Sequence, residues 1–79
     1  MLGPFLRATR EQLGLTQTAL ADTLGVSQGT VSAVECGRVG LGLDDFADWS
    51  AALHLTDEQR LEALRLAGLP RESVQPGAA

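Results

Sequence analysis

The residues best suited to chemistry in this 79-residue chain are glutamines and small polar side chains on one face of a short predicted helix. Val31 and Val34 must face inward, which leaves an outward face without charge; its members are Gln28, Gly29, Ser32 and Ala33, with Thr30 at the margin. A glutamine amide can pair with both N6 and N7 of an adenine, and small neighbours let a helix enter the major groove. This face therefore predicts base reading in duplex DNA.

The alternative is that this face is an ordinary solvated helix surface. Exposed helix positions usually carry Glu, Lys or Arg, which favour helix formation and solubility. The face has none of these residues, and it keeps Gly29, which costs about 1 kcal/mol relative to alanine inside a helix. We therefore favour groove recognition over a solvated surface.

Catalytic and metal chemistry have no comparable support. The sequence has no nucleophile and base pair, no metal-ligand spacing and no phosphate-binding loop, so we expect neither an enzyme nor a cofactor. Cys36 is the single cysteine, and we expect it to be a buried structural thiol, as free cysteines commonly are. The lone His54 is interpreted as a helix-end residue.

Two short helices that cross at a tight turn would position the outward face. From residue 17 to residue 36 the apolar positions change phase once, next to Gly25, where a positive φ is needed to end a helix. Thr16 and Ser27 precede the two helical runs as N-caps, and Ala21 is small where the helices must approach. The apolar positions are Leu20, Leu24, Val26, Val31 and Val34. This pattern predicts a helix-turn-helix over residues 17–36.

Three further helices would complete an all-α bundle of five helices over residues 1–70. The first begins at Gly3-Pro4, with the proline at its first position, and ends at Gly14. The next is capped by Asp44 and runs to about Leu53. Their inward positions are Phe5, Leu6, Thr9 and Leu13 in the first, and Phe46, Trp49, Ser50 and Leu53 in the second.

The last predicted helix follows a capping box, in which Thr56 and Gln59 satisfy each other's backbone donors, and it ends near Ala67. Its leucines Leu61 and Leu64, with Leu69 beyond it, either form a dimer interface or only close the core of the monomer. Residues 71–79 are polar and small, and we expect them to be a disordered tail.

The distribution of charge decides whether an acidic chain can approach DNA. The net charge is −4, with a pI near 4.6 and no lysine, which predicts weak non-specific affinity. In residues 1–40 three arginines balance three carboxylates, whereas residues 41–79 have three arginines against seven carboxylates. The helix-turn-helix half is thus neutral, and the acidic half could point away from a duplex.

Phosphate contacts are expected at two places. The backbone from Thr16 to Thr18 lies at a helix N-terminus, where free N–H groups and the positive end of the dipole favour an anion, and the Gln17 amide could assist. The same amide could instead brace Gln28. Arg38 is the best-placed cation for a second phosphate, although it could equally complement the C-terminal dipole of the preceding helix.

The segment from Arg7 to Gly37, RATREQLGLTQTALADTLGVSQGTVSAVECG, resembles the Xre-type regulators and the lambdoid phage repressors and Cro proteins. The match covers RxxREQLGLTQxxLAxxLGVSQxTVSxxExG. The resemblance implies that Gln28 contacts an adenine and that Arg10 pairs with Glu35 to tie two helices together. It also implies groove contacts from Gly29, Ser32 and Ala33, and phosphate contacts from Gln17 and Arg38.

The chain departs from that family in two places. The loop after Gly37 has a single basic residue, Arg38, and Gly29 and Ala33 stand where related proteins often carry longer polar side chains. Both departures lower the expected affinity of one subunit, so dimerisation or a second DNA-binding partner becomes more necessary.

Together these features predict a cytoplasmic, bacterial or phage-encoded, nucleoid-associated regulator that acts as a repressor or autoregulator. It would form a homodimer and read a palindromic operator in double-stranded DNA. The longest apolar runs are only a few residues, so no membrane association is expected. The alternative is a protein-interaction adaptor, such as an antitoxin-like protein or a regulator subunit, with a toxin or another regulator as its partner. The acidic second half favours the adaptor, and the uncharged helix face favours DNA.

Overall fold

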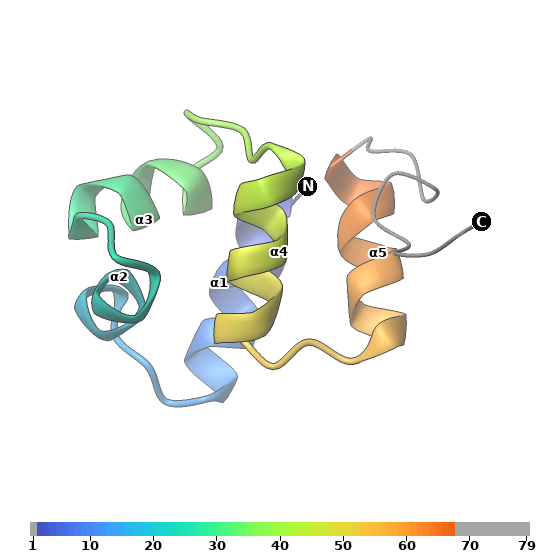
Figure 1. The fold of residues 1–79 in the computed structure, drawn as a ribbon, viewed down its shortest axis with the longest axis horizontal. Coiled ribbons are helices and arrows are strands. Elements are labelled where there is room, and N and C mark those ends of the chain that lie inside the picture. The colour runs from blue at the N-terminus through green and yellow to red at the C-terminus, as the bar shows by residue number, and fades with distance from the viewer. Residues whose placement is uncertain (1, 68–79) are drawn as a thin grey trace.

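A computed structural model describes residues 2–67 of the chain, and within them it contains five α-helices and no strand. The helices are α1 (Leu2–Gln12), α2 (Gln17–Leu24), α3 (Gln28–Glu35), α4 (Leu43–Ala52) and α5 (Asp57–Ala67). In Figure 1, α1 and α4 occupy the centre, with α2 and α3 on one side and α5 on the other. The predicted all-α bundle of five helices is confirmed.

The turn between α2 and α3 is built as the sequence predicts. The Thr16 Oγ1 accepts from the Ala19 N–H at 3.0 Å, and the Ser27 Oγ accepts from the Thr30 N–H at 3.2 Å. Gly25 has a φ of 72°, and its N–H bonds to carbonyls in the last turn of α2. Ala21 is buried where α2 meets α3. The two N-caps and the turn glycine therefore set the angle at which α3 leaves α2.

The core has two parts joined by α1. Under the helix-turn-helix, α1, α2, α3 and α4 bury Leu6, Leu20, Ala21, Val31, Val34, Trp49 and Leu53. Beside α5, the buried residues are Phe46, Ala63 and Leu64. Leu2 and Phe5 of α1 pack against both clusters, so α1 connects the helix-turn-helix to the last helix. The inward positions predicted for α4 are confirmed, since Phe46, Trp49, Ser50 and Leu53 are all buried.

Several local expectations were wrong. Leu13 and Val26 are 45% and 40% exposed, because each lies just beyond a helix end and its side chain leaves the inner face. Asp44 is not the N-cap of α4: the helix begins at Leu43, Gly42 takes the cap position, and no side chain caps it. Pro4 is the third residue of α1, not the first. The capping box of Thr56 and Gln59 is present, with bonds of 2.9 and 3.1 Å.

Gly3 lies where α1 crosses the end of α3. A Cβ at this position would approach the Val34 carbonyl oxygen to 2.8 Å and would clash with the carbonyl oxygen of Glu35. Both obstacles are backbone atoms, which cannot move without shifting α3. A glycine therefore lets the first turn of α1 touch the last turn of α3.

The leucines considered for a dimer interface occupy different environments. Leu64 is 2% exposed and belongs to the core, whereas Leu61 is 41% exposed. Leu69 and the predicted tail at 71–79 lie outside the described residues. None of the helices in residues 2–67 has the length and apolar character needed to cross a membrane.

Candidate nucleic-acid interface

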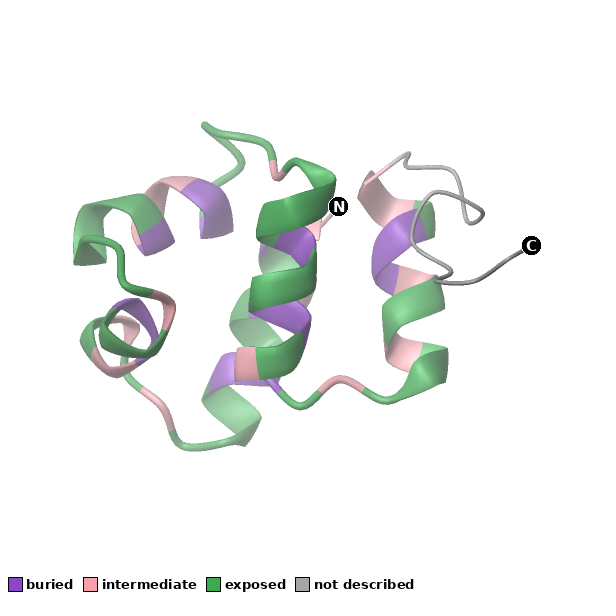
Figure 2. Cartoon of the chain, in the orientation of Figure 1, coloured by how far each residue is buried: buried purple, intermediate pink, exposed green. Residues whose placement is uncertain are grey.

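The N-terminal end of α3 is exposed at the surface of the helix-turn-helix. Gln28 and Gly29 are exposed, Thr30 is exposed beside them, and Ser32 and Ala33 are half-buried. Figure 2 shows the exposed residues at the start of α3 and the buried ones nearer its end. The hydroxyl of Thr30 lies 3.0 Å from that of Ser27, so this side chain is already engaged within the protein. The predicted face is thus most accessible at Gln28 and Gly29.

The side chain of Gln28 is held by α2. Its Nε2 donates to the Oε1 of Gln17 at 2.6 Å, across the turn of the helix-turn-helix. Gln28 is exposed and Gln17 is half-buried, so the bond joins the surface to a more protected position. A long side chain at a helix surface otherwise samples several rotamers, and a bond of this kind restricts that freedom before any ligand arrives.

Gln17 in turn bonds to the end of α3. Its Nε2 donates to the Oε1 of Glu35 at 3.0 Å. The side chains of Glu35, Gln17 and Gln28 therefore form one chain of hydrogen bonds, which we call the amide relay. It begins at a carboxylate in the core and ends at an amide on the exposed face of α3.

Arg10 of α1 holds the buried end of the amide relay. Its Nε and Nη2 donate to the two carboxylate oxygens of Glu35 at 2.6 and 3.1 Å, and its Nη1 donates to the Leu15 carbonyl at 2.7 Å. The two side chains are 8% and 2% exposed. The hydrogen bonds that Arg10 donates to Glu35 raise the pKa of Arg10 above its usual value, and the desolvation that comes with burial opposes this effect only in part. The arginine therefore stays charged, and it joins α1, the following turn and α3.

The positions considered for phosphate contact lie at the surface. Thr16 and Thr18 are exposed at the start of α2, where the Thr16 hydroxyl already caps the helix. Arg38 is exposed just beyond α3, after Gly37 at a φ of 79°. Gln17 faces inward to Glu35 and Gln28. Two roles were considered for the Gln17 side chain, to brace Gln28 and to assist a phosphate contact. Both are compatible with its position, because the Gln17 Nε2 has a second hydrogen.

The structure places one residue differently from the expectation and contains one connection that was not predicted. Cys36 is exposed, not buried, because it is the C-cap residue of α3 and lies beyond its inner face. The bond between Gln17 and Glu35 was not foreseen. One signal could have found it, since Glu35 follows Gln28 by seven residues, which puts both on the same side of α3 two turns apart. One side chain from α2 can therefore reach both.

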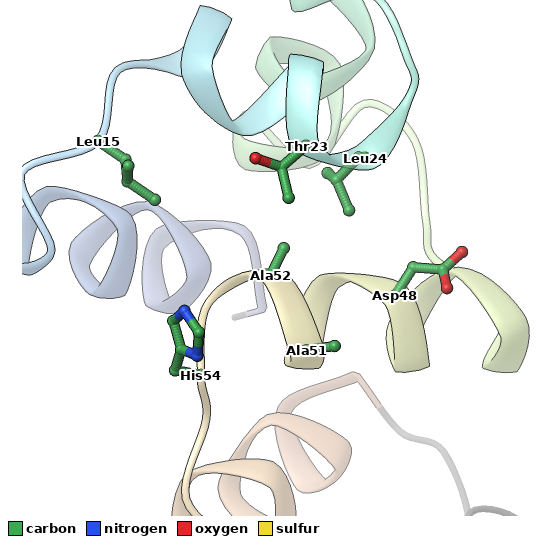
Figure 3. Close-up of a pocket in the computed structure, with 7 residues that line it drawn as sticks. All are labelled: Leu15, Thr23, Leu24, Asp48, Ala51, Ala52 and His54. Carbon is green, nitrogen blue, oxygen red and sulfur yellow. The ribbon is translucent and has the colours of Figure 1, made fainter.

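A shallow groove of about 540 Å³ lies between α2 and α4. Figure 3 shows Asp48 and His54 at opposite ends of it, with Ala51 and Ala52 between them. Its lining is Leu15, Thr23, Leu24, Asp48, Ala51, Ala52 and His54. Residues 2–67 contain no group of three His, Cys, Asp or Glu side chains that could hold a metal ion.

Comparison with protein families gives a match for most of the chain. Residues 1–64 match the sequence model of a family described as a helix-turn-helix domain. The matched region contains α1 to α4 and most of α5, and so includes the whole of the amide relay. No match was found among curated proteins or among solved structures.

Proposed function

We propose that this chain, which belongs to the helix-turn-helix domain family, is a sequence-specific DNA-binding regulator that reads an operator through the major groove with α3. In this proposal Gln28 contacts a base, and Gly29, Ser32 and Ala33 lie against the groove. The resemblance to the Xre-type and lambdoid repressors supports a repressor or autoregulator.

The observation that carries this proposal is the state of the Gln28 side chain. It is exposed at the N-terminal end of α3, and the bond to Gln17 uses one of its amide hydrogens. Among the described residues no second partner bonds to this amide, so its other hydrogen and its Oε1 remain for a ligand. One donor and one acceptor on a planar amide match the N7 and N6 edge of an adenine. An amide braced in this way recognises a base with less loss of side-chain entropy than a free one.

Phosphates would flank the base contact. The backbone N–H groups of Gln17 and Thr18 lie in the first turn of α2 and can donate to an anion, and Arg38 beyond α3 can reach a second phosphate. The exposed carboxylates of α4, Asp44, Asp45 and Asp48, would be repelled by the same duplex. We therefore place the DNA against α2 and α3, with the acidic helices turned away.

A homodimer fits this arrangement. Two phosphate contacts per subunit are few, and a second copy would double them and present two α3 helices about 34 Å apart, one turn of DNA. Of the three leucines considered for the interface, Leu61 is the exposed one in the described residues, and Leu64 contributes to the core.

The test is selection of bound sequences from a random duplex library with the native protein, Gln28→Ala and Gln12→Ala. Gln12 is an exposed glutamine at the end of α1 and serves as the matched control. The proposal predicts a palindromic site for the native protein and the control, and a loss on the order of 1 to 3 kcal/mol at that site for Gln28→Ala. No enrichment by a folded native protein would contradict it.

The second candidate is a protein-interaction adaptor with little DNA binding of its own. The observation that favours it is charge: α4 and the start of α5 expose five carboxylates, while Arg38 is the one basic residue between α3 and α4. The two functions separate by salt, because phosphate contacts release counterions and weaken steeply as salt rises. Binding to a protein partner that is insensitive to salt, without a DNA footprint, would support the adaptor.

A further inference from the structure

We propose that the groove between α2 and α4 is a docking site for a basic, amphipathic helix of a partner protein. This inference goes beyond the proposed function, because no residue of α3 lines the groove and the DNA contact does not enter the argument. We call this feature the α2–α4 groove. Its lining is Leu15, Thr23, Leu24, Asp48, Ala51, Ala52 and His54.

The floor of the α2–α4 groove is apolar and open. Leu15, Leu24 and Ala52 are half-buried, so each exposes part of an apolar side chain there. The Thr23 hydroxyl donates to the Ala19 carbonyl at 3.2 Å, and Figure 3 shows the Thr23 methyl group directed toward α4. Because Ala52 faces these side chains with only a methyl group, the space of about 540 Å³ between the two helices stays open.

The shape of the groove favours a helix as its occupant. Small-molecule sites enclose most of their ligand, typically about 70–90% of its surface, whereas a shallow groove covers only one face. A helix with an apolar stripe fits such a groove, because it buries the stripe and leaves its polar face in water. An extended segment would instead add to the free edge of a sheet, and residues 2–67 contain no strand.

The charge of α2 and α4 indicates the chemistry of the partner. The two helices carry four carboxylates and no lysine or arginine. The four are Asp22, Asp44, Asp45 and Asp48, all exposed. The ion pairs within residues 2–67 involve other carboxylates, in α1, α3 and α5. The sides of the α2–α4 groove are therefore negative without internal compensation, and a partner that carries lysine or arginine beside its apolar stripe is complementary to them.

The backbone at the end of α4 provides a second observation. The ends of α1, α2 and α3 each have a residue with a φ between 72° and 79°, and in each it is a glycine. These three residues are Gly14, Gly25 and Gly37. At the end of α4, the His54 N–H bonds to the Ala51 carbonyl at 3.2 Å and the Leu55 N–H bonds to the Ser50 carbonyl at 3.0 Å. This is the same type of helix end, yet His54 occupies it with a φ of 53°.

The histidine at this position has a cost that a glycine avoids. A side chain in the left-handed region is less stable than glycine there, because its Cβ approaches the following carbonyl. His54 is exposed and lines the α2–α4 groove, so its imidazole is available to a partner. An imidazole nitrogen without a proton accepts a hydrogen bond from lysine or arginine. Asp48 and His54 lie at opposite ends of the groove (Figure 3), so each can contact one end of a basic helix lying along it.

The test uses two model helices as probes for the full chain. Both are peptides of about 14 residues, nearly four turns, with leucines on one face. The remaining positions are lysine in one peptide and glutamate in the other. We expect the lysine peptide to bind in calorimetric titrations and to shift the amide NMR signals of the groove lining. The glutamate peptide should not bind.

Two substitutions separate the groove from general attraction between opposite charges. Ala51→Trp fills the groove from an exposed position of α4 and should weaken binding of the lysine peptide about tenfold or more. Asp48→Lys reverses the charge at one end and should weaken it about tenfold. Glu58→Lys makes the same change of net charge at an exposed position of α5 outside the lining, and should change the affinity about twofold or less.

His54→Gly distinguishes a side chain used for binding from one used for folding. Glycine removes the cost of the left-handed φ, so the midpoint of thermal unfolding should rise by several degrees. The affinity for the lysine peptide should nevertheless fall about fivefold, because one end of the site is lost. Gly37→His is the matched control: it places a histidine at the φ of 79° after α3, and should lower the unfolding midpoint without changing peptide affinity.

Four results would overturn the proposal. The first is that the native chain binds neither peptide. The second is equal weakening by Asp48→Lys and Glu58→Lys, which would show attraction by net charge alone. The third is a dimer in sedimentation experiments that Ala51→Trp disrupts, because the groove would then hold a second copy of the chain. The fourth is a His54→Gly variant with raised stability and unchanged affinity. Selection of an operator is a separate measurement, so its failure would leave this inference standing.

Discussion

Around the helix-turn-helix, polar side chains bond from one helix to another, whereas in α5 they bond within a single helix. Arg10 reaches Glu35, Glu35 reaches Gln17, and Gln17 reaches Gln28, each bond spanning at least eleven residues of sequence. In α5 the pairs are Arg60 with Asp57 and Arg65 with Glu62, each three residues apart and partly exposed.

The difference matters because the two kinds of bond have different consequences. An exposed pair within one helix contributes little, typically 0.2–1 kcal/mol, and restricts only its own two side chains. A buried pair with further hydrogen bonds is costly to break and fixes both the relative placement of helices and the direction of each side chain. The helix-turn-helix half thus carries an oriented amide at its surface, while the acidic half carries only charge.

The largest contrast should appear when one carboxylate is removed from each half. Glu35→Ala leaves Arg10 buried without its partner, so we expect a loss of about 3–5 kcal/mol in the free energy of unfolding. Glu62→Ala removes the matched carboxylate of the exposed pair with Arg65 and should cost about 1 kcal/mol or less. Urea unfolding measures both. Equal losses would show that the buried pair is not the stronger connection.

The next largest loss of stability is expected from a substitution at the contact between α1 and α3. Gly3→Ala would push a methyl group into the last carbonyls of α3, and we expect a loss of about 1–3 kcal/mol in the free energy of unfolding. Because α3 would shift, operator binding should fall as well, even though Gly3 is buried and cannot touch the DNA itself. Thermal unfolding and DNA binding measured on the same sample check this. Unchanged stability would mean that the two helices can separate freely.

Phosphate contact should be confined to the helix-turn-helix half. If each subunit of a dimer neutralises about two phosphates, the slope of log K against log salt should be about −3 to −4. Arg38→Ala should make this slope shallower by about 2 for the dimer and weaken binding on all sequences alike. Arg60→Ala, in α5, should leave the slope unchanged. A native slope near −8 would show that the basic groups at the interface have been misplaced.

The smallest effect separates folding from binding at a single position. A Cβ at Gly29 would meet only the Ser27 hydroxyl, at 3.8 Å, so the fold has room for alanine. Gly29→Ala should therefore raise the free energy of unfolding by up to about 1 kcal/mol, through helix propensity. The same methyl group would enter the space left for the groove and should weaken operator binding. A variant that gains stability with unchanged operator affinity would remove Gly29 from the interface.

The parts of the fold that were predictable from sequence depend on residues close to one another in the chain. Thr16, Ser27 and Gly25 bond to atoms three or four residues away, and the apolar periods of α2 to α5 are likewise local. The features that were not predicted depend instead on residues far apart in the chain. Gly3 is needed because of carbonyls more than thirty residues later, and no spacing along the chain shows that contact.

The candidate site divides in the same way. The exposed face of α3 followed from its periodicity, and the placement of Gln28 and Gly29 needed no tertiary information. The orientation of the Gln28 amide did, because it depends on Glu35 through Gln17. Cys36 was misplaced because a residue at a helix end can turn inward or outward, and only the packing of the following turn decides which.

The most direct measurement is a titration of 15N-labelled protein with the selected operator duplex, followed by amide NMR spectra. We expect the largest shifts at residues 16–18, at residues 28–33 and at Arg38, with the Gln28 side-chain NH2 among them. The exposed residues of α4 and α5 should change little. Shifts concentrated on α4 and α5, or no shifts at concentrations that saturate the operator, would contradict the account.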